Sequence, residues 1–350
     1  MPTRLVPIVA LVAMLAACSS PGGEDTGSGP ALPIGASFPA VLTDDIVGDV
    51  ATVRLPGRVY EVEVTRRKGQ TDAVSADDAG YRPEAADGAA LVAVAWRPQP
   101  AEGDAIALGA HGPEVSPTIA VRVGGETFPV GAMDEEGVHA RWVAVPEAGT
   151  VGVAVGFDGV TRSVEDMTDG RPTFTGGSAL LDGPPPGLHD PECPLPDEPE
   201  EPAQYVLGGC TLQVSDPFPY HRDLGWAEDG QGWVVVHLRV DPVVVGWDEP
   251  GPGGAVVDYE VEPQEVTVTL DGAGPTDLVA WEPDRPAGLQ DDGTWEGDAV
   301  FSVAEDVTAY EVRFTRPSIA RPEDPDEAAA EGTPAEIDGT YAATIPVTVG

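Results

Sequence analysis

The side chains that could carry out chemistry are scattered along this sequence and do not stand at the spacings that known reaction motifs require. The sequence contains no His-Glu-x-x-His, Gly-x-x-x-x-Gly-Lys or Gly-x-Ser-x-Gly pattern. The histidines show no metal-ligand spacing; they are His111, His139, His189, His221 and His237. We expect His237 to face solvent from a strand, with a catalytic base as the alternative. The sequence therefore predicts no catalytic residue and favours a protein that is not an enzyme.

Acidic clusters fall between the expected strands. They are Asp44–Asp45, Asp77–Asp78, Asp134–Glu136, Asp291–Asp292 and Glu323–Glu327. Oxygen-rich loops can bind Ca²⁺, but none of these clusters has the spacing of a calcium loop, so we assign no metal site and no cofactor and leave calcium open. Two facing carboxylates could also hydrolyse a glycosidic bond. An acid-pair hydrolase of the cell envelope is therefore one alternative function.

Tryptophan is concentrated in the second half of the chain, where Trp226, Trp247 and Trp295 stand near Gly, Asp and Pro. Indoles in exposed loops can stack against sugar rings, so these three are candidates for a carbohydrate-binding surface. The alternative is that each indole folds back over the edge of the core. Trp96 and Trp233 lie within strand-like runs and are expected to pack inside.

The chain is strongly acidic, with 18 basic and 60 acidic residues and a formal net charge of −42. Nucleic acid is excluded as a partner because nothing in the sequence forms a basic footprint. An anionic membrane surface or wall polymer would also repel these residues. Cations and basic proteins remain as electrostatically favoured partners.

The first residues have the features of an export signal. Arg4 precedes the apolar run from Leu5 to Ala17, and 13 residues are too few to cross a hydrocarbon core of roughly 30 Å as a helix. The run ends in Leu15-Ala16-Ala17-Cys18, which resembles the lipobox of bacterial lipoproteins. That resemblance implies a signal peptide over residues 1–17, a lipid on Cys18 and an extracytoplasmic protein anchored to a membrane. An ordinary secretory signal with an incidental cysteine is the alternative.

A flexible, Gly- and Ser-rich tether over residues 18–33 follows the lipobox. Two further cysteines, Cys193 and Cys210, remain after Cys18. In an oxidising compartment we expect them to form a disulfide, which would stabilise the fold by about 3 kcal/mol. Two free thiols are disfavoured outside the cytoplasm, and a zinc site would lack ligands.

The remaining chain is long enough for two domains, over residues 34–182 and 204–350, with a Pro-rich acidic linker over residues 183–203. Both parts are rich in Val and aromatic residues with a period of two, which predicts an all-β fold. The expected strands are Val59–Val64, Leu91–Trp96, Ile119–Val123, Val151–Phe157, Trp233–Val240, Val266–Leu270 and Thr308–Phe314.

The two halves also resemble each other. Residues 87–97 align with residues 229–239 without a gap, so that Val92, Val94 and Trp96 correspond to Val234, Val236 and Leu238. Two later runs, 119–123 with 266–270 and 153–157 with 310–314, follow in the same order. This order predicts a duplicated sandwich.

Gly48–Val53, Tyr60–Val64, the strand after Asp87-Gly88 and the late Val-x-Val-x-Phe run together resemble the telokin-like, immunoglobulin-type domains of small bacterial lipoproteins. The likeness covers roughly residues 45–160 and, more loosely, 205–316. It implies two immunoglobulin-like β-sandwiches in tandem but no activity. The acidity and the insertion between Val64 and Leu91 depart from that pattern.

We therefore predict a membrane-anchored extracytoplasmic lipoprotein that acts as a non-enzymatic binding or scaffold module. Its partner would be a protein or glycan of the cell envelope. A carbohydrate-binding lipoprotein is the first alternative, and the acid-pair hydrolase is the second.

Overall fold

The computed structural model describes residues 31–40, 48–67, 84–99, 115–133, 138–194, 204–241, 244–248, 256–262, 264–279, 287–290, 293–326 and 333–349. Its named elements over these ranges are 25 strands and one 3-10 turn. The predicted all-β fold is confirmed. Among these residues no helix has the length and apolar character needed to span a lipid bilayer.

The N-terminal unit contains two antiparallel sheets, with strand orders β2-β9-β6-β4-β3 and β11-β10-β7-β8, and the short parallel pair β1-β5. Its strands are β1 (Ala31–Leu32), β2 (Ser37–Pro39), β3 (Asp49–Leu55), β4 (Arg58–Arg67), β5 (Glu84–Ala85), β6 (Ala89–Gln99), β7 (Thr118–Val123), β8 (Glu126–Ala132), β9 (His139–Pro146), β10 (Val151–Phe157) and β11 (Val160–Val164).

The C-terminal unit also contains two large sheets, with orders β12-β14-β17-β23-β21 and β13-β18-β19-β24-β20. Strand β22 joins the first sheet on β23, β25 joins the second on β24, and β15-β16 is a separate hairpin. The elements are η3 (Ala179–Leu181), β12 (Leu188–His189), β13 (Gln204–Leu207), β14 (Cys210–Ser215), β15 (Tyr220–His221), β16 (Gly225–Trp226), β17 (Gln231–Val240), β18 (Val244–Asp248), β19 (Val256–Glu262), β20 (Thr267–Leu270), β21 (Asp277–Val279), β22 (Gly288–Leu289), β23 (Trp295–Ala304), β24 (Ala309–Pro322) and β25 (Ile337–Thr348).

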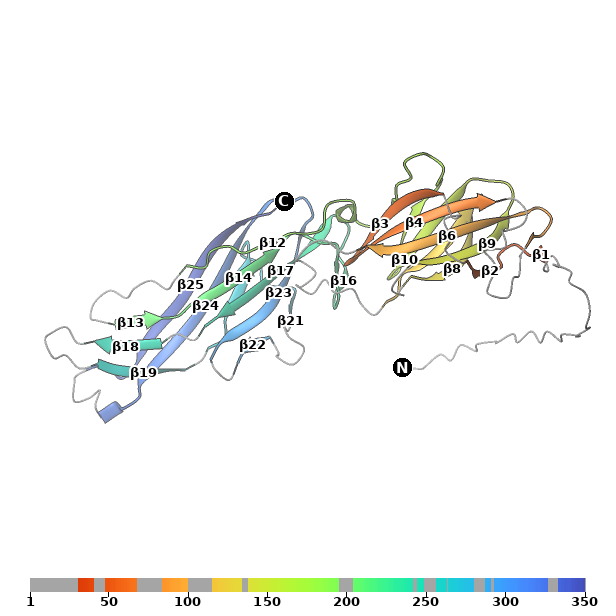
Figure 1. Ribbon diagram of the computed structural model, residues 1–350. Helices are drawn as coiled ribbons and strands as arrows, with labels where there is room; N and C mark the ends of the chain where they lie inside the picture. Colours follow the sequence, from red (N-terminus) through yellow and green to blue (C-terminus); the bar gives the residue numbers. More distant parts are fainter. Residues whose placement is uncertain are drawn as a thin grey trace, which may run out of the picture.

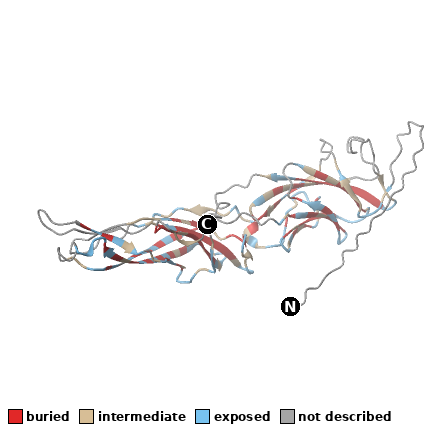
Figure 2. Cartoon of the chain, turned by 90° about the horizontal axis from the view of Figure 1, so that it is seen from below, coloured by how far each residue is buried: buried red, intermediate tan, exposed pale blue. Residues whose placement is uncertain are grey.

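In each unit the two large sheets enclose one hydrophobic core. Alternating side chains of β6, such as Val92 and Val94, meet those of β10, such as Val153 and Val155. The inward side chains of β17 meet those of β24 and β25 in the same way. The buried strips run through the interior of both units in Figure 2. Because successive side chains of a strand point to opposite faces, the period of two places these residues inside.

The central strands are also buried on their outer faces, which their alternation does not predict. In the N-terminal unit, Leu32 of β1 and Phe38 of β2 cover the outer face of β6, where they pack against Leu91, Ala93 and Ala95. In the C-terminal unit, Trp233 and Val235 of β17 lie in a cluster with Phe218. A strand covered on both faces is apolar throughout, as β6 is.

The segments that align in sequence have equivalent strand pairings. Strands β6 and β17 are the central strands of their sheets, and each pairs with one earlier strand (β4 or β14) and one later strand (β9 or β23). The pairings β7–β10–β11 match the pairings β20–β24–β25. The sequence similarity of the halves therefore corresponds to a repeated order of pairing.

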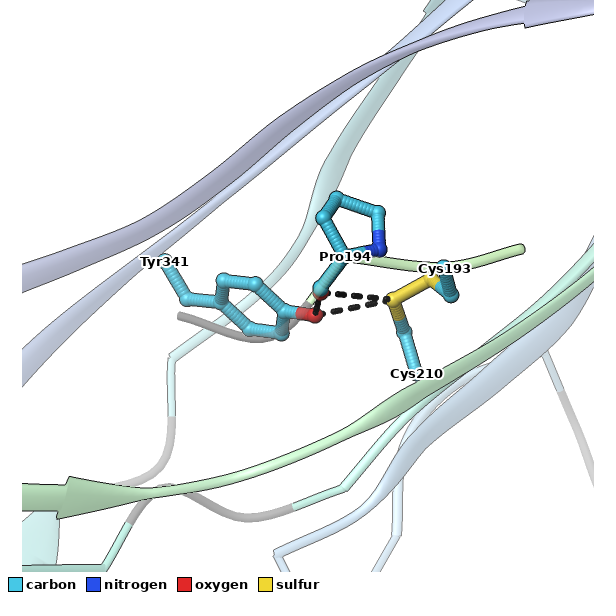
Figure 3. Close-up of a disulfide and its surroundings, with 4 residues drawn as sticks. All are labelled: Cys193, Pro194, Cys210 and Tyr341. Atoms are coloured by element: carbon cyan, nitrogen blue, oxygen red, sulfur yellow. Dashed lines mark hydrogen bonds between the residues drawn. A yellow bond between two sulfur atoms is a disulfide. The ribbon is translucent and has the colours of Figure 1, made fainter. Parts of the chain in front are cut away.

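The predicted linker of residues 183–203 is partly incorporated into the C-terminal unit. β12 pairs with β14, and Cys193 is bonded to Cys210 with a Cα–Cα distance of 5.7 Å, which confirms the predicted disulfide. The Tyr341 hydroxyl donates to the Pro194 carbonyl and lies 2.9 Å from Sγ of Cys210 (Figure 3). Only residues up to 194 are described here, and this part is attached to β14 and β25.

The two units are arranged end to end (Figure 1). The short strand β1 lies at the end of the N-terminal unit that is farther from the C-terminal unit, and β16 lies between the two units. Strand β10 runs along the N-terminal unit toward the junction and ends there at Phe157. The first described residue, Ala31, and the C-terminal unit are thus at opposite ends of the N-terminal unit.

Candidate functional site at the junction of the two units

The β15–β16 hairpin of the C-terminal unit inserts aromatic side chains into the core of the N-terminal unit. Tyr220 is only 3% exposed and belongs to the core cluster formed by β3, β4, β6, β7 and β10. Its ring centroid is 5.3 Å from that of Phe157 and 5.1 Å from that of Trp226. All three rings meet edge to face, the favoured geometry of aromatic pairs. The hairpin therefore closes one end of the N-terminal core.

Polar contacts surround this aromatic cluster. The indole N–H of Trp226 donates to the carbonyl of Asp158 at 3.0 Å. The buried hydroxyl of Tyr220 bonds the carboxylate of Asp158; burial, and next this bond, raise the pKa of Tyr220 to about 12. Asp158 occupies a left-handed turn, with φ of 42°, between β10 and β11. One tight turn of the N-terminal unit thus holds both aromatic residues of the hairpin.

The chain between the units is held from both sides. Arg54 of β3 donates to the Gly183 carbonyl at 2.8 Å. Arg162 of β11 is 2% exposed and donates to the Phe174 carbonyl at 3.0 Å and to the Asp182 carboxylate. On the other side, Leu180 of η3 packs on Gly232, where an added Cβ would lie 3.0 Å from Leu180 Cδ1. These contacts fix the position of one unit relative to the other.

Two histidines, His221 and His237, and the carboxylate of Asp298 are buried on the outer face of the C-terminal sheet. His237 of β17 lies directly opposite Asp298 of β23, and Nδ1 of His237 is 2.8 Å from the carboxylate. His237 is 6% exposed and Asp298 is 4% exposed. The prediction that His237 faces solvent is wrong, because the outer face of this sheet is covered. Each side chain of the pair gives the other a hydrogen-bond partner, which a buried polar group needs.

His221 connects the hairpin to this buried face. It is 1% exposed, and its Nδ1 accepts a hydrogen bond from the backbone N–H of Asp223 at 3.2 Å. Burial lowers the pKa of His221, while the nearby carboxylates of Asp223, Asp298 and Asp277 oppose that shift. The neutral form of His221 is therefore the form that the folded hairpin favours.

We expect acidification to weaken the folded state through His221. Its pKa is about 6.5 in the unfolded chain and lower in the folded protein, so the unfolded chain binds more protons as the pH falls through 6.5. The free energy of unfolding should decrease in that window, by at most about 1.4 kcal/mol per pH unit for one proton. Urea unfolding at pH 7.5, 6.5 and 5.5 measures this slope. His221→Gln should reduce it, and a slope equal to that of the unmodified protein would contradict the assignment.

A cavity of about 420 Å³ lies at the opposite end of the N-terminal unit, lined by Asp49, Thr65, Arg66, Thr150 and Thr168 among others. The Arg66 guanidinium donates at 2.7 Å to the carbonyls of Pro146 and Gly149, and also to that of Glu147. Arg66 thus ties β4 to the turn after β9. Its two terminal nitrogens, Nη1 and Nη2, donate to these backbone carbonyls, whereas its buried Nε has no hydrogen-bond partner among the described residues. The terminal nitrogens give this cavity a structural explanation.

The three candidate tryptophans do not form one surface. Trp295 is 1% exposed in the core of the C-terminal unit, with its indole N–H donating to Glu265 at 3.0 Å. Trp226 is half-buried at the junction. Trp247 is in β18, but its side chain lies outside the described residues. Trp295 is therefore wrong as a sugar-stacking residue, because a buried ring offers no face to a ligand.

The other sequence candidates are mostly in parts of the chain outside the description. Cys18 and the acidic pairs at 44–45, 77–78 and 291–292 fall there, as does the cluster at 134–136. Residues 323–326 are described and exposed. Over the described ranges, no three His, Cys, Asp or Glu side chains are grouped so that they could hold a metal ion.

The junction was not found by sequence reasoning. Its residues come from both halves of the chain, and the aromatic residues beside Pro219 and Gly225 are the one local signal of a hairpin. Comparison with known proteins adds no further information: no family model, no curated protein and no solved structure matches this chain.

Proposed function

We propose that this chain is an extracytoplasmic lipoprotein, anchored by a lipid on Cys18, that binds an envelope partner without catalysing a reaction. In this proposal the N-terminal unit is a spacer, and the C-terminal unit is presented away from the membrane. Both units are proposed to be immunoglobulin-like domains. The repeated pairing of β6, β7, β10 and β11 with β17, β20, β24 and β25 supports that last part.

The observation that carries the proposal is the fixed junction. Tyr220 and Trp226 pack on Phe157, and Arg54 and Arg162 hold the connecting chain. Such a junction differs from the freely moving domains that a flexible linker would give. Because β1 and the C-terminal unit lie at opposite ends of the N-terminal unit, a lipid before β1 would hold the C-terminal unit at a distance from the membrane (Figure 1).

The anchor is tested by metabolic labelling of the full-length chain with an alkyne fatty acid in a bacterium that processes lipoproteins. We expect label on the protein, with loss of the label and of membrane fractionation in Cys18→Ser. Cys193→Ser is the matched control, because it removes a different cysteine and should keep the label. Equal labelling of Cys18→Ser and the unmodified chain would contradict the anchor.

The position of the binding surface is tested by photo-crosslinking in cells. Val50 of β3 and Leu278 of β21 are 49% and 50% exposed, so crosslinking amino acids at these sites sample the two units equally. We expect reproducible capture of an envelope component from the position at Leu278 and none from the position at Val50. The reverse pattern would contradict the assignment of the N-terminal unit as a spacer.

A further inference from the structure

We propose that the outer edge of β25 is a docking strand for an extended, basic segment of a partner protein. This inference deepens the proposed function by naming the chemistry of the partner. It rests on that function for its biological setting, whereas its structural argument comes from the C-terminal unit alone.

Strand β25 is a long edge strand. It runs from Ile337 to Thr348 and pairs with β24 in an unbroken register, from Thr348 opposite Ala309 to Ile337 opposite Ala320. Strand β24 continues the sheet on its other side through β19 and β20. No second strand pairs with β25 among the residues that the structure describes. At 12 residues, β25 is about twice the usual strand length.

The register shows which backbone groups point to the open side. Val349 donates its N–H to Thr308, the residue directly opposite, so this is a hydrogen-bonded pair. Such pairs alternate along an antiparallel ladder, so the odd-numbered residues of β25 bond to β24. The backbone N–H of Asp271 donates to the carbonyl of Glu311. This bond agrees with the assignment, because it shows that an odd-numbered residue of β24 directs its carbonyl toward β20 and away from β25.

The even-numbered residues of β25 therefore direct their backbone groups outward. Asp338, Thr340, Ala342, Thr344 and Thr348 each offer an N–H and a carbonyl on the open side, and their side chains are exposed. Pro346 also takes an outward position, where its missing N–H costs no bond to β24. The row is a nearly complete template for one more strand.

The usual protections of an edge strand are weak here. The outward side chains include no lysine, the pairing with β24 contains no bulge, and the inward side chains are Tyr341, Ala343, Ile345 and Val347. By contrast, the pairing of the edge strand β8 with β7 contains a register shift; both edge strands contain one proline, Pro129 in β8 and Pro346 in β25. Strand β25 can therefore accept an added strand without a change in its own backbone.

Charge decides the kind of occupant. The chain as a whole carries a net charge of −42, and Asp338 is the one charged side chain on the exposed face of β25. The field of the whole chain would therefore repel a second copy and attract a basic segment. In an added strand, every second residue would cover the edge of the hydrophobic core, and the residues between them would face solvent. The expected partner segment alternates apolar residues with Lys or Arg.

Hydrogen–deuterium exchange with residue-level fragmentation tests this on the full-length chain in detergent. Without a peptide, the amides of Thr340, Ala342 and Thr344 should exchange rapidly, while those of Tyr341, Ala343 and Ile345 are protected. A synthetic octapeptide that alternates Val and Lys should slow the even-numbered amides at least tenfold. The same peptide with Glu in place of Lys should have no effect. Even-numbered amides already protected without peptide would overturn the proposal, because the edge would be covered by this chain itself or by a second copy.

Matched variants locate the effect on the edge. Ala342→Pro removes one outward N–H, as Pro346 does naturally, and should weaken binding of the Val-Lys peptide at least tenfold without loss of the β24 pairing. Thr344→Val keeps every backbone donor and should bind as the unmodified chain does. Equal binding by Ala342→Pro would overturn the docking strand. If Cys18 carries no lipid but the peptide binds as expected, the proposed anchor is wrong and the docking strand is supported. If Cys18 is acylated but the amides of β25 do not respond to the peptide, the anchor is supported and the docking strand is wrong.

Discussion

Replacing Tyr220 by Ala should lower the free energy of unfolding by about 3–5 kcal/mol and release the two units from each other. Tyr220 is 3% exposed in the N-terminal core although it belongs to the C-terminal unit. Its removal leaves a cavity beside Phe157 and deletes the hydrogen bond to Asp158. Urea unfolding followed by far-UV circular dichroism measures the loss. Small-angle X-ray scattering should show a wider distribution of overall dimensions.

The matched control is Tyr310→Ala. Tyr310 is also 3% exposed, but it lies in the core of the C-terminal unit on β24. We expect a similar loss of stability with no change in the scattering of the folded protein, because the junction is untouched. If the two variants behave alike in scattering, Tyr220 does not couple the units. If Tyr220→Ala is as stable as the unmodified chain, its assignment to the N-terminal core is incorrect.

Replacing Trp295 by Ala should also cost about 3–5 kcal/mol. Its indole is 1% exposed among the inward side chains of β17, β23 and β24, and its N–H bonds Glu265 at 3.0 Å. Truncation leaves both a cavity and a carboxylate without its donor. Far-UV circular dichroism in urea is the appropriate measurement, because the substitution itself changes tryptophan fluorescence.

Trp295→Phe separates the two contributions. It keeps a large ring in the core and removes the N–H, so its loss of stability should be smaller than that of Trp295→Ala. Retention on insoluble polysaccharides, compared at a temperature where each variant is folded, should be the same for both variants and the unmodified chain. A selective loss of glycan retention with unchanged stability would restore Trp295 as a binding residue.

Three features of this protein follow from the sequence alone. The period of two in runs such as 119–123 and 308–314 determines strands, because only an extended chain places alternate side chains on one face. The aligned motifs of the two halves predict that β6 and β17 hold equivalent central places, and they do. The pairing of Cys193 with Cys210 was expected because the chain has only three cysteines, and the structure shows it.

The candidate site could not be predicted in the same way. Alternation marks one face of a strand as inward but does not show whether another segment covers the opposite face. That is why His237 was expected in solvent and is instead buried opposite Asp298. Trp295 likewise follows Gly293 and Thr294, a local context typical of a loop, yet it begins β23 and points into the core.

The sequence by itself determined the strand content, the repeated order of motifs and the disulfide, because each depends on neighbouring residues or on a small count. Only the tertiary structure decided that Tyr220 completes the core of the other unit and that, among the described residues, β25 is paired on one side alone. Both depend on which distant segments meet. The free energy of such contacts comes from burying surfaces of residues that are far apart in the sequence. A local sequence pattern therefore does not predict these contacts.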